Sequence, residues 1–491
     1  MKKELNLMIT PAEFPVPLII LLETDSTNNY LTQLCNEQQS AVREFTTVIA
    51  ERQTAGKGQR GNSWESEDCS FLLPTAMQAQ YLRSSYFMEG SSTRIQLNPA
   101  LQPKRGYVNL PGIGSVNAEV ATNSLGIQDV IDVFDSDGEF YNNDKFYNRL
   151  KGMNEVNISA NTDVISFGFY KGKGFWSFNV GARADVDATI PKTMFDYLRA
   201  TDADNFSWSG ESFDIRNEKL RLNAYIEVGA GYSRAINERL TVGGKAKLLL
   251  GAGNINLNIN QLYMYGKDAG IDSEFQLKTD AYLEASAKGL DLEEENGYIT
   301  DLDYNSFGIS GYGAGIDLGA SYQVMKNLTV SAAILDLGFI SWGKSSTQIA
   351  ESDKNTTIDK NNYSESSDVL DFDLFGLKKK ENKSRTTSLS PTMVIGGEYG
   401  LLNNKLGLGL LSTTRFGQLK TYSELTFSAN YRPNTLINTT LSYSMLQGGE
   451  TFGIAFKIGP LMLGTDYMYF GNNSKHVNAF IGLSIPLGKK I

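Results

Sequence analysis

The chain has 491 residues, of which 41% are hydrophobic, and a formal net charge of -10. No uncharged apolar run approaches the ~20 residues that a membrane-spanning helix needs, and an acidic chain lacks the basic surface that nucleic-acid backbones require, so a helical membrane protein is excluded and no nucleic-acid partner is expected. The 47 glycines, 24 tyrosines and 25 phenylalanines favour many strands joined by turns, which predicts an all-β fold.

Two motifs lie near the N-terminus. Residues 23–28 have the sequence Glu-Thr-Asp-Ser-Thr-Asn, and residues 50–64 have the sequence Ala-Glu-Arg-Gln-Thr-Ala-Gly-Lys-Gly-Gln-Arg-Gly-Asn-Ser-Trp. The glycines of the second motif would let the backbone approach a phosphate, and its cations would offset the phosphate charge. Its glycine spacing also fits the dinucleotide-binding fingerprint, but residues 62–67 are a poor helix start, which weakens that interpretation.

Through these paired motifs, residues 23–67 resemble biotin protein ligases. In that family the Ser-Thr-Asn triplet and the glutamine before the glycine loop contact biotin, and the basic glycine loop folds over biotin and the adenylate. The resemblance therefore implies contacts with biotin or the adenylate from Ser26, Thr27, Asn28, Gln53, Gly56, Lys57, Gly58 and Arg60. Gln59 stands where many members of the family carry arginine.

The ligase-like segment is short. The family's central sheet, and its later strand with a lysine that stabilises the acyl phosphate, are both missing after Asp68. A domain of about seventy residues cannot bury a core of its own. We therefore predict that residues 1–69 are a small α/β fragment without ligase activity, so that biotin and ATP would be cofactors only if this fragment were functional.

Residues 70–80, Ser-Phe-Leu-Leu-Pro-Thr-Ala-Met-Gln-Ala-Gln, resemble the end of a secretory signal peptide that is cut after Ala79. Only the tail of a signal is present, because polar residues 65–69 occupy the place of its apolar part. The true N-terminus imitates a signal, but acidic residues and prolines interrupt it. We predict a signal remnant at residues 70–79 and a second domain at residues 80–491, and expect the interruption, typical of a gene fusion, to hinder export.

Apolar and polar residues alternate over long stretches of the second domain. From Arg221 to Ser233 the even positions are apolar, and the pattern resumes from Thr241 to Leu250 after a short turn at residues 236–239. The same period of two recurs at residues 314–324, 330–334, 451–458 and 477–485. Paired stretches of this kind around short turns predict β-hairpins.

Strand length and face composition distinguish a membrane barrel from a soluble sandwich. Soluble strands average about 5–6 residues, whereas several of these stretches approach or exceed the ~9–11 residues of a tilted membrane strand. Their polar faces carry small or charged residues such as Gly229, Lys247 and Asp317, as a watery lumen requires. We predict a transmembrane antiparallel β-barrel of roughly 14 strands, within a range of about 12–16.

The connections between these strands are uneven in length. Residues 171–174 form a compact turn, whereas residues 266–304 and 343–388 are long and polar, and we predict both as extracellular loops. The second stretch is rich in carboxylates that could hold a divalent cation. Their spacing is not that of a cation site, so we favour a solvated loop and predict no metal site.

Several aromatic residues lie near apparent strand ends, where an interfacial girdle would place them; ordinary cross-strand packing is the alternative. They are Trp176, Tyr232, Trp342, Tyr467 and Tyr469. A single histidine, His476, leaves little room for catalytic triads or histidine-based metal sites. We predict that it is a surface residue at a strand end and that the chain has no catalytic residues.

Residues 80–491 resemble a large family of outer-membrane barrels that carry a domain of unknown function. They are more distantly similar to long-chain fatty-acid transporter barrels and to the barrel that shuttles type IX secretion cargo. The resemblance is carried by residues 86–90, Asn98-Pro99-Ala100-Leu101-Gln102-Pro103, residues 165–169 and residues 336–343. It implies an outer-membrane location, with the lipid bilayer and the barrel-assembly machinery as partners.

These observations lead to three functional hypotheses. The first is a non-enzymatic outer-membrane barrel whose lumen or N-terminal hatch admits a small or hydrophobic ligand, as the similar transporter barrels imply. The second is a surface scaffold whose long loops bind a partner. The third, a biotin–protein ligase, requires a functional N-terminal fragment.

Overall fold

The computed structural model describes the backbone of residues 18–24, 47–57 and 63–66 and most of residues 83–488. Gaps in the last range fall at residues 111–113, 127–128, 130–139, 204–205, 267–274, 353–356, 360–371, 435, 447–448 and 468–474. The chain divides into two compact units, Met1–Leu73 and Pro74–Ile491. No helix among the described residues is long and apolar enough to cross a membrane.

The first unit contains a three-stranded sheet of β1 (Leu18–Thr24), β2 (Thr47–Lys57) and β3 (Ser63–Ser66). β1 and β2 are parallel, which requires a long crossover connection, and β3 is antiparallel to β2. The described residues of this unit are all in strands, so the α/β fragment predicted for residues 1–69 stays a prediction. The predicted signal remnant at residues 70–79 lies outside the described part of the chain.

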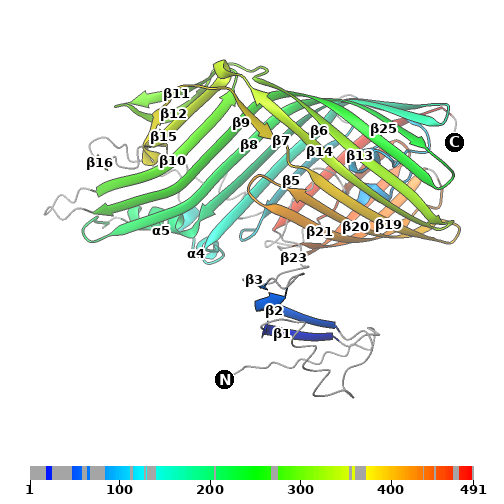
Figure 1. Ribbon diagram of the computed structural model, residues 1–491, viewed down its shortest axis with the longest axis horizontal. Coiled ribbons are helices and arrows are strands. Elements are labelled where there is room, and N and C mark those ends of the chain that lie inside the picture. Colours follow the sequence, from blue (N-terminus) through cyan, green and yellow to red (C-terminus); the bar gives the residue numbers. More distant parts are fainter. Residues whose placement is uncertain are drawn as a thin grey trace. The chain divides into compact units, whose positions relative to one another are not determined.

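Strands of the second unit close into an antiparallel barrel with 14 strand positions around its circumference, which confirms the predicted fold (Figure 1). Three of these positions are each formed by two shorter strands in line, namely β4 with β5, β10 with β13, and β18 with β19. β25 closes the barrel against β4 and β5. The barrel strands are β4 (Gly106–Asn109), β5 (Val116–Thr122), β6 (Met153–Lys171), β7 (Gly174–Pro191), β8 (Ser212–Ala235), β9 (Leu240–Gly266), β10 (Phe275–Ala287), β13 (Gly311–Met325), β14 (Leu328–Trp342), β18 (Arg385–Ser388), β19 (Thr392–Leu401), β20 (Leu406–Phe416), β21 (Thr421–Tyr431), β22 (Ile437–Leu446), β23 (Gly449–Ile458), β24 (Leu461–Thr465) and β25 (His476–Leu487).

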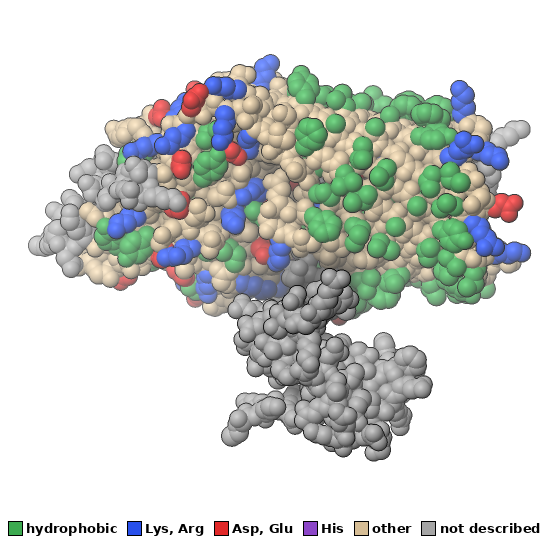
Figure 2. Space-filling view, in the orientation of Figure 1, with side chains coloured by type: hydrophobic (Ala, Val, Ile, Leu, Met, Phe, Trp, Pro, Cys, Tyr) green, Lys and Arg blue, Asp and Glu red, His purple; other side chains and the backbone are tan. Residues whose placement is uncertain are grey.

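The barrel wall is apolar outside and polar inside. On β8, Val228 and Tyr232 are exposed, whereas Glu227 and Ser233 are buried. Figure 2 shows hydrophobic side chains spread over the right-hand part of the wall, with charged side chains towards its left end and also at its right-hand tip. A soluble protein buries its large apolar side chains. Here the apolar side chains are exposed and the polar ones are buried, as expected for a wall that faces lipid around a polar lumen.

Short turns join the strands at one end of the barrel. β6 and β7 are joined at Lys171–Gly174, where Gly172 has a φ of +62°. The predicted hairpins β8–β9 and β13–β14 are also present. In outer-membrane barrels the short turns face the periplasm and the long connections face the outside, which orients the molecule.

The outer ends of β8, β9 and β10 extend beyond the lipid-facing wall and belong to a folded extracellular module. Its hydrophobic core contains Phe195, Leu257, Leu283 and Phe375, among others. The other elements at this end are η3 (Phe140–Asn142), α4 (Asp144–Tyr147), α5 (Lys192–Thr201), β11 (Leu290–Glu295), β12 (Tyr298–Tyr304), η4 (Lys344–Ser346), β15 (Thr347–Ser352), β16 (Thr357–Asp359), η6 (Phe372–Phe375) and β17 (Leu377–Lys379).

The two segments predicted as extracellular loops therefore contain strands. Residues 266–304 include β10, β11 and β12, and residues 343–388 include β15, β16, β17 and β18. β10 pairs with β9 on one side and with β15 and β16 on the other. Because these strands bury apolar residues in the module, the polar composition alone does not define an irregular loop.

The predicted aromatic girdle is confirmed only in part. Trp176 and Tyr232 face outward, with their ring centroids 4.7 Å apart. Trp342 and Tyr467 are buried, so the prediction was wrong for both. In β14 the register against β13 shifts beside Asp336, which has a φ of +59°, and this bulge turns Trp342 from the outer face to the inner face.

Candidate functional site

A segment of the chain itself fills the lumen. Residues 83–105, named the plug below, precede β4 and contain η2 (Arg83–Phe87) and α2 (Arg94–Leu97). Tyr86 and Leu97 of the plug share a buried apolar cluster with residues of β14, β19 and β20. The plug therefore corresponds to the N-terminal hatch that the sequence predicts, and it occupies the lumen that was the other predicted ligand path.

Glycines in the wall make room for the plug. A Cβ atom on any of four inward glycines would overlap plug atoms; for example, a Cβ on Gly409 would lie 2.6 Å from the Phe87 ring. The four are Gly243 on β9, Gly319 on β13, Gly396 on β19 and Gly409 on β20. Since real Cβ atoms do not approach so closely, the wall and the plug are shaped for each other.

Gly396 and Gly397 provide a matched test of this fit. A Cβ on Gly396 would overlap the Tyr86 ring, whereas a Cβ on Gly397 would have its nearest neighbours 3.9 Å away. We expect Gly396→Val to displace the plug and to increase hydrogen–deuterium exchange in residues 83–105 at least tenfold, while Gly397→Val leaves it unchanged. Equal exchange in the two variants would show that the plug does not depend on this fit.

Asn98 fixes the middle of the plug to the wall. Its Nδ2 donates to the carbonyl oxygens of Ala320 and Ala332, at 3.3 and 3.2 Å, and its Oδ1 accepts from the backbone N–H of Ala100 at 2.9 Å. The Asn98-Pro99-Ala100 motif that carries the sequence resemblance is thus the point at which the plug bridges β13 and β14.

Arg83 anchors the outer end of the plug. Its backbone N–H donates to Asp466 Oδ2 at 2.6 Å, and its guanidinium lies 2.7 Å from Glu424 Oε2 and 3.2 Å from Thr413 Oγ1. The Tyr467 hydroxyl also donates to Glu424 Oε2, at 2.8 Å. The buried cation is therefore matched by carboxylates from the wall, as a charge in a low-dielectric site requires.

Arg432 anchors the periplasmic end. Its guanidinium lies 2.8 Å from Glu398 Oε1 of the wall and 3.7 Å from Glu89 Oε1 of the plug, and it donates to the carbonyl oxygen of Phe87 at 3.2 Å. Lys104 forms an ion pair with the same plug carboxylate. The plug is thus held at both ends by ion pairs and hydrogen bonds, which are reversible contacts.

A cluster of charges lies inside the barrel on β8, β9, β13 and β14. Lys247 Nζ lies 2.6 Å from Asp336 Oδ1, 2.8 Å from Asp317 Oδ1 and 3.6 Å from Glu227 Oε2. All four side chains are buried. Because Asp336 sits in the bulge of β14, the same irregularity that turns Trp342 inward also brings this carboxylate to the lysine.

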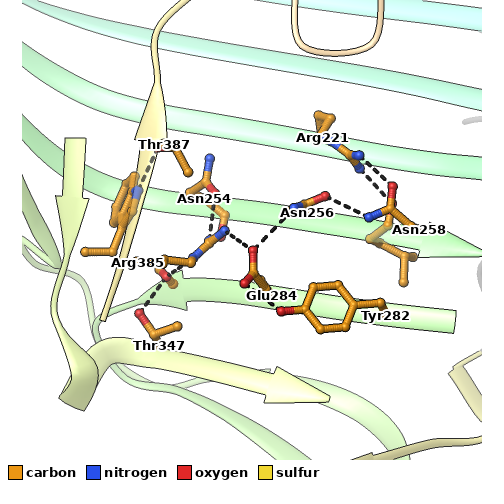
Figure 3. Close-up of polar contacts among 12 residues, drawn as sticks. Arg221, Asn254, Asn256, Asn258, Tyr282, Glu284, Thr347, Arg385 and Thr387 are labelled. Atoms are coloured by element: carbon orange, nitrogen blue, oxygen red, sulfur yellow. Dashed lines mark hydrogen bonds and ion pairs between the residues drawn. The ribbon is translucent and has the colours of Figure 1, made fainter. Parts of the chain in front are cut away.

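A second polar network continues the inner face towards the outside (Figure 3). Arg385 of β18 donates to Asn254 Oδ1 at 2.6 Å and lies 3.3 Å from Glu284 Oε2. Glu284 accepts from the Tyr282 hydroxyl at 2.7 Å, and Arg221 donates to Asn258 Oδ1 at 2.6 Å. The polar lumen therefore extends past the lipid-facing wall into the extracellular module.

The cavities that the plug leaves in the barrel differ in volume. Those lined by described residues include one of about 380 Å³ at the periplasmic mouth and three in the lumen, of about 20, 20 and 10 Å³. A void of 20 Å³ holds about one water molecule. Any ligand larger than water that crosses the described lumen therefore needs the plug or the side chains around it to move.

The resemblance to biotin protein ligases predicts eight contact residues in the first unit. Of the eight, Gln53, Gly56 and Lys57 lie on β2, where Gly56 pairs with Trp64 of β3. The other five lie outside the described residues, as does Tyr469. Contacts with biotin or the adenylate remain predictions from the resemblance.

His476 begins β25, as predicted, but it is buried and not at the surface. Its ring faces the Tyr467 ring, with 6.0 Å between centroids. The inward face of β25 at this end is covered by Tyr467, which accounts for the difference. No group of three or more His, Cys, Asp or Glu side chains among the described residues is arranged to hold a metal ion.

The inverted wall and the internal plug define this chain as a plugged β-barrel of the outer-membrane type. Residues 99–466 match the family of unknown function DUF5723, and the chain belongs to that family. No curated protein matches it.

Solved barrels of similar architecture are distant. The toluene transporter TbuX of Ralstonia pickettii is 11% identical, with a TM-score of 0.39, 82% of this chain covered and 98% of the other. The toluene transporter TodX of P. putida is 10% identical, with a TM-score of 0.35 and 83% and 95% covered. A Pseudomonas aeruginosa FadL homologue is 7% identical, with a TM-score of 0.30 and 83% and 98% covered.

Proposed function

We propose that this protein is a non-enzymatic outer-membrane barrel that transports a small ligand, with the plug as its gate. The observation that supports it most directly is the fitted but reversible contact between plug and wall. Glycines shape the wall for the plug, yet polar contacts hold both of its ends. A permanent seal would gain more from an apolar interface, since buried ion pairs add little net stability.

The ligand is proposed to be small and amphipathic. The sequence resemblance to transporter barrels implies a hydrophobic compound, whereas the charges around Lys247 and Arg385 would oppose a wholly apolar one in the lumen. A compound with an apolar body and one polar group satisfies both conditions. Benzoate is a suitable probe, and sucrose reports leakage.

A disulfide between plug and wall tests the gate. A Cβ on Gly319 would lie 3.0 Å from Asn98 Cγ, close to the about 3 Å between Cβ and the partner sulfur in a disulfide. We expect the Asn98→Cys/Gly319→Cys variant, in a Cys35→Ser/Cys69→Ser background, to lose at least nine tenths of its benzoate uptake in liposomes when oxidised and to recover it on reduction.

The outcomes separate the hypotheses. Equal uptake before and after reduction would reject the plug as the gate. No uptake by the parent protein in either state would reject transport. The second candidate, a surface scaffold, would then be favoured, because the extracellular module has its own core and the segment after β12 exposes Phe307 and Ile309.

A further inference from the structure

The cavity at the periplasmic mouth has a volume of about 380 Å³ and is lined by described residues. It lies between the plug, the strand β4 that follows it, and the turns after β19 and β21. Pockets for small molecules start at about 300 Å³. The cavity therefore has room for a small ligand, and none of the contacts described for the gate fills it.

The ionisable residues around this cavity are mainly cations. They are Lys104, Arg105, Lys405, Arg432 and Lys457, against the single carboxylate of Glu89. Within the described residues, the ion pairs of this region are those of Glu89 with Lys104 and Arg432 and that of Glu398 with Arg432. Arg105, Lys405 and Lys457 thus line one void without a carboxylate partner among the described residues, and such a concentration of like charge attracts an anion.

Neutral donors complete the wall. Ser92 and Ser484 line the cavity, and their hydroxyl groups are 3.1 Å apart. Asn438, which is only 5% exposed, also lines it, and its Oδ1 has no hydrogen-bond partner among the described residues. Rotation of that amide would present Nδ2, a donor, in the same place. An anion would satisfy both the charges and the donors.

We propose that this cavity is a binding site for a small anion of the phosphate class, which competes with Glu89 for Lys104 and Arg432. Phosphate presents several charged oxygens at once, which suits a wall of lysine and arginine side chains better than a single carboxylate does. Because Glu89 belongs to the plug, a bound anion weakens the periplasmic anchor, and by reciprocity a released plug raises the affinity for the anion.

The test uses inorganic phosphate and the purified full-length protein in neutral detergent, with binding followed by phosphorus NMR line broadening. We expect Lys405→Gln/Lys457→Gln to weaken binding at least tenfold and Glu89→Gln to tighten it at least threefold. Lys326→Gln, in a periplasmic turn whose lysine does not line the cavity, should bind like the parent protein. Folding of each variant is checked by its heat-dependent mobility on a gel.

Binding of phosphate by the parent that neither variant alters, or no saturable binding at all, would overturn the proposal. The source of the anion is decided in lipid nanodiscs. Loss of phosphate binding in anionic phosphatidylglycerol, but not in phosphatidylcholine, assigns the site to a lipid headgroup, and binding in both assigns it to a free phosphate. The assay measures binding without transport, so its failure and the failure of the uptake experiment are separate results.

Discussion

Replacement of Lys247 by methionine is expected to destabilise the barrel by about 3–5 kcal/mol, the usual cost of removing one partner from a buried ion pair. Methionine preserves most of the side-chain volume but leaves Asp317 and Asp336 buried without their cation. Urea unfolding in detergent micelles, followed by tryptophan fluorescence, would measure the loss.

Two further variants show whether charge is the cause. Lys247→Met/Asp317→Asn/Asp336→Asn removes the opposing charges as well, and we expect it to recover more than half of the lost stability. Glu227 remains paired with Lys245 in this variant. Lys173→Met, in the exposed turn between β6 and β7, should change stability by less than about 0.5 kcal/mol. A triple variant no more stable than Lys247→Met would assign the loss to packing.

The stability of the extracellular module is expected to fall as the pH rises from 5 to 8. Glu218 lies on β8 opposite Ile259 of the module's core, and neither carboxylate oxygen has a hydrogen-bond partner among the described residues. Burial raises the pKa of Glu218 to about 8. The lipid-facing part of β8 is marked by Val228 and Tyr232. Glu218 lies in the preceding part of the strand, which belongs to the extracellular module, and is therefore outside the membrane.

The direction follows from proton counting. Between about pH 4.5 and 8 the folded module keeps the proton of Glu218, whereas the unfolded chain has released it. Stability is therefore complete below the unfolded pKa and is lost as the pH rises towards 8, by on the order of 4–5 kcal/mol. This is opposite to the behaviour of an ion-paired carboxylate, whose stabilisation is lost towards acid.

Limited proteolysis of the module in urea at pH 5, 7 and 9 would measure this dependence. We expect the urea midpoint of the parent protein to fall with pH and that of Glu218→Gln to stay nearly constant. Glu211→Gln, at an exposed position just before β8, should retain the parental dependence. A parental midpoint that does not change with pH would contradict a buried, protonated Glu218.

The strands of the wall could be predicted because each of their residues faces either lipid or the lumen, and is apolar or polar accordingly. On β8 the alternation of polar and apolar residues, as at Glu227 and Val228, is visible in the sequence without knowledge of any partner strand. Such a pattern fails where the backbone is irregular. Trp342 shares the parity of Val330 in the sequence, but the bulge at Asp336 reverses the faces between them.

The plug and the module needed information that local patterns do not carry. Gly243 and Gly319 fall on the polar faces of their strands, as expected, yet the residues that require them to be glycines are Asn98 and Pro99, far away in the chain. In the module, Leu277, Ala281 and Leu283 already show a period of two. The polar residues between them concealed a strand within a stretch predicted as a loop.

The wall glycines also determine when the plug can settle. Its contacts come from β9, β13, β19 and β20, and Asp466 directly follows β24. These strands span most of the order of the chain, so a partly assembled wall offers only part of the plug's binding surface, and contacts so distant in sequence form slowly. We therefore expect the first segment of the barrel domain to be among the last to reach its final position, so that a barrel that has just closed is open through its centre until the plug docks.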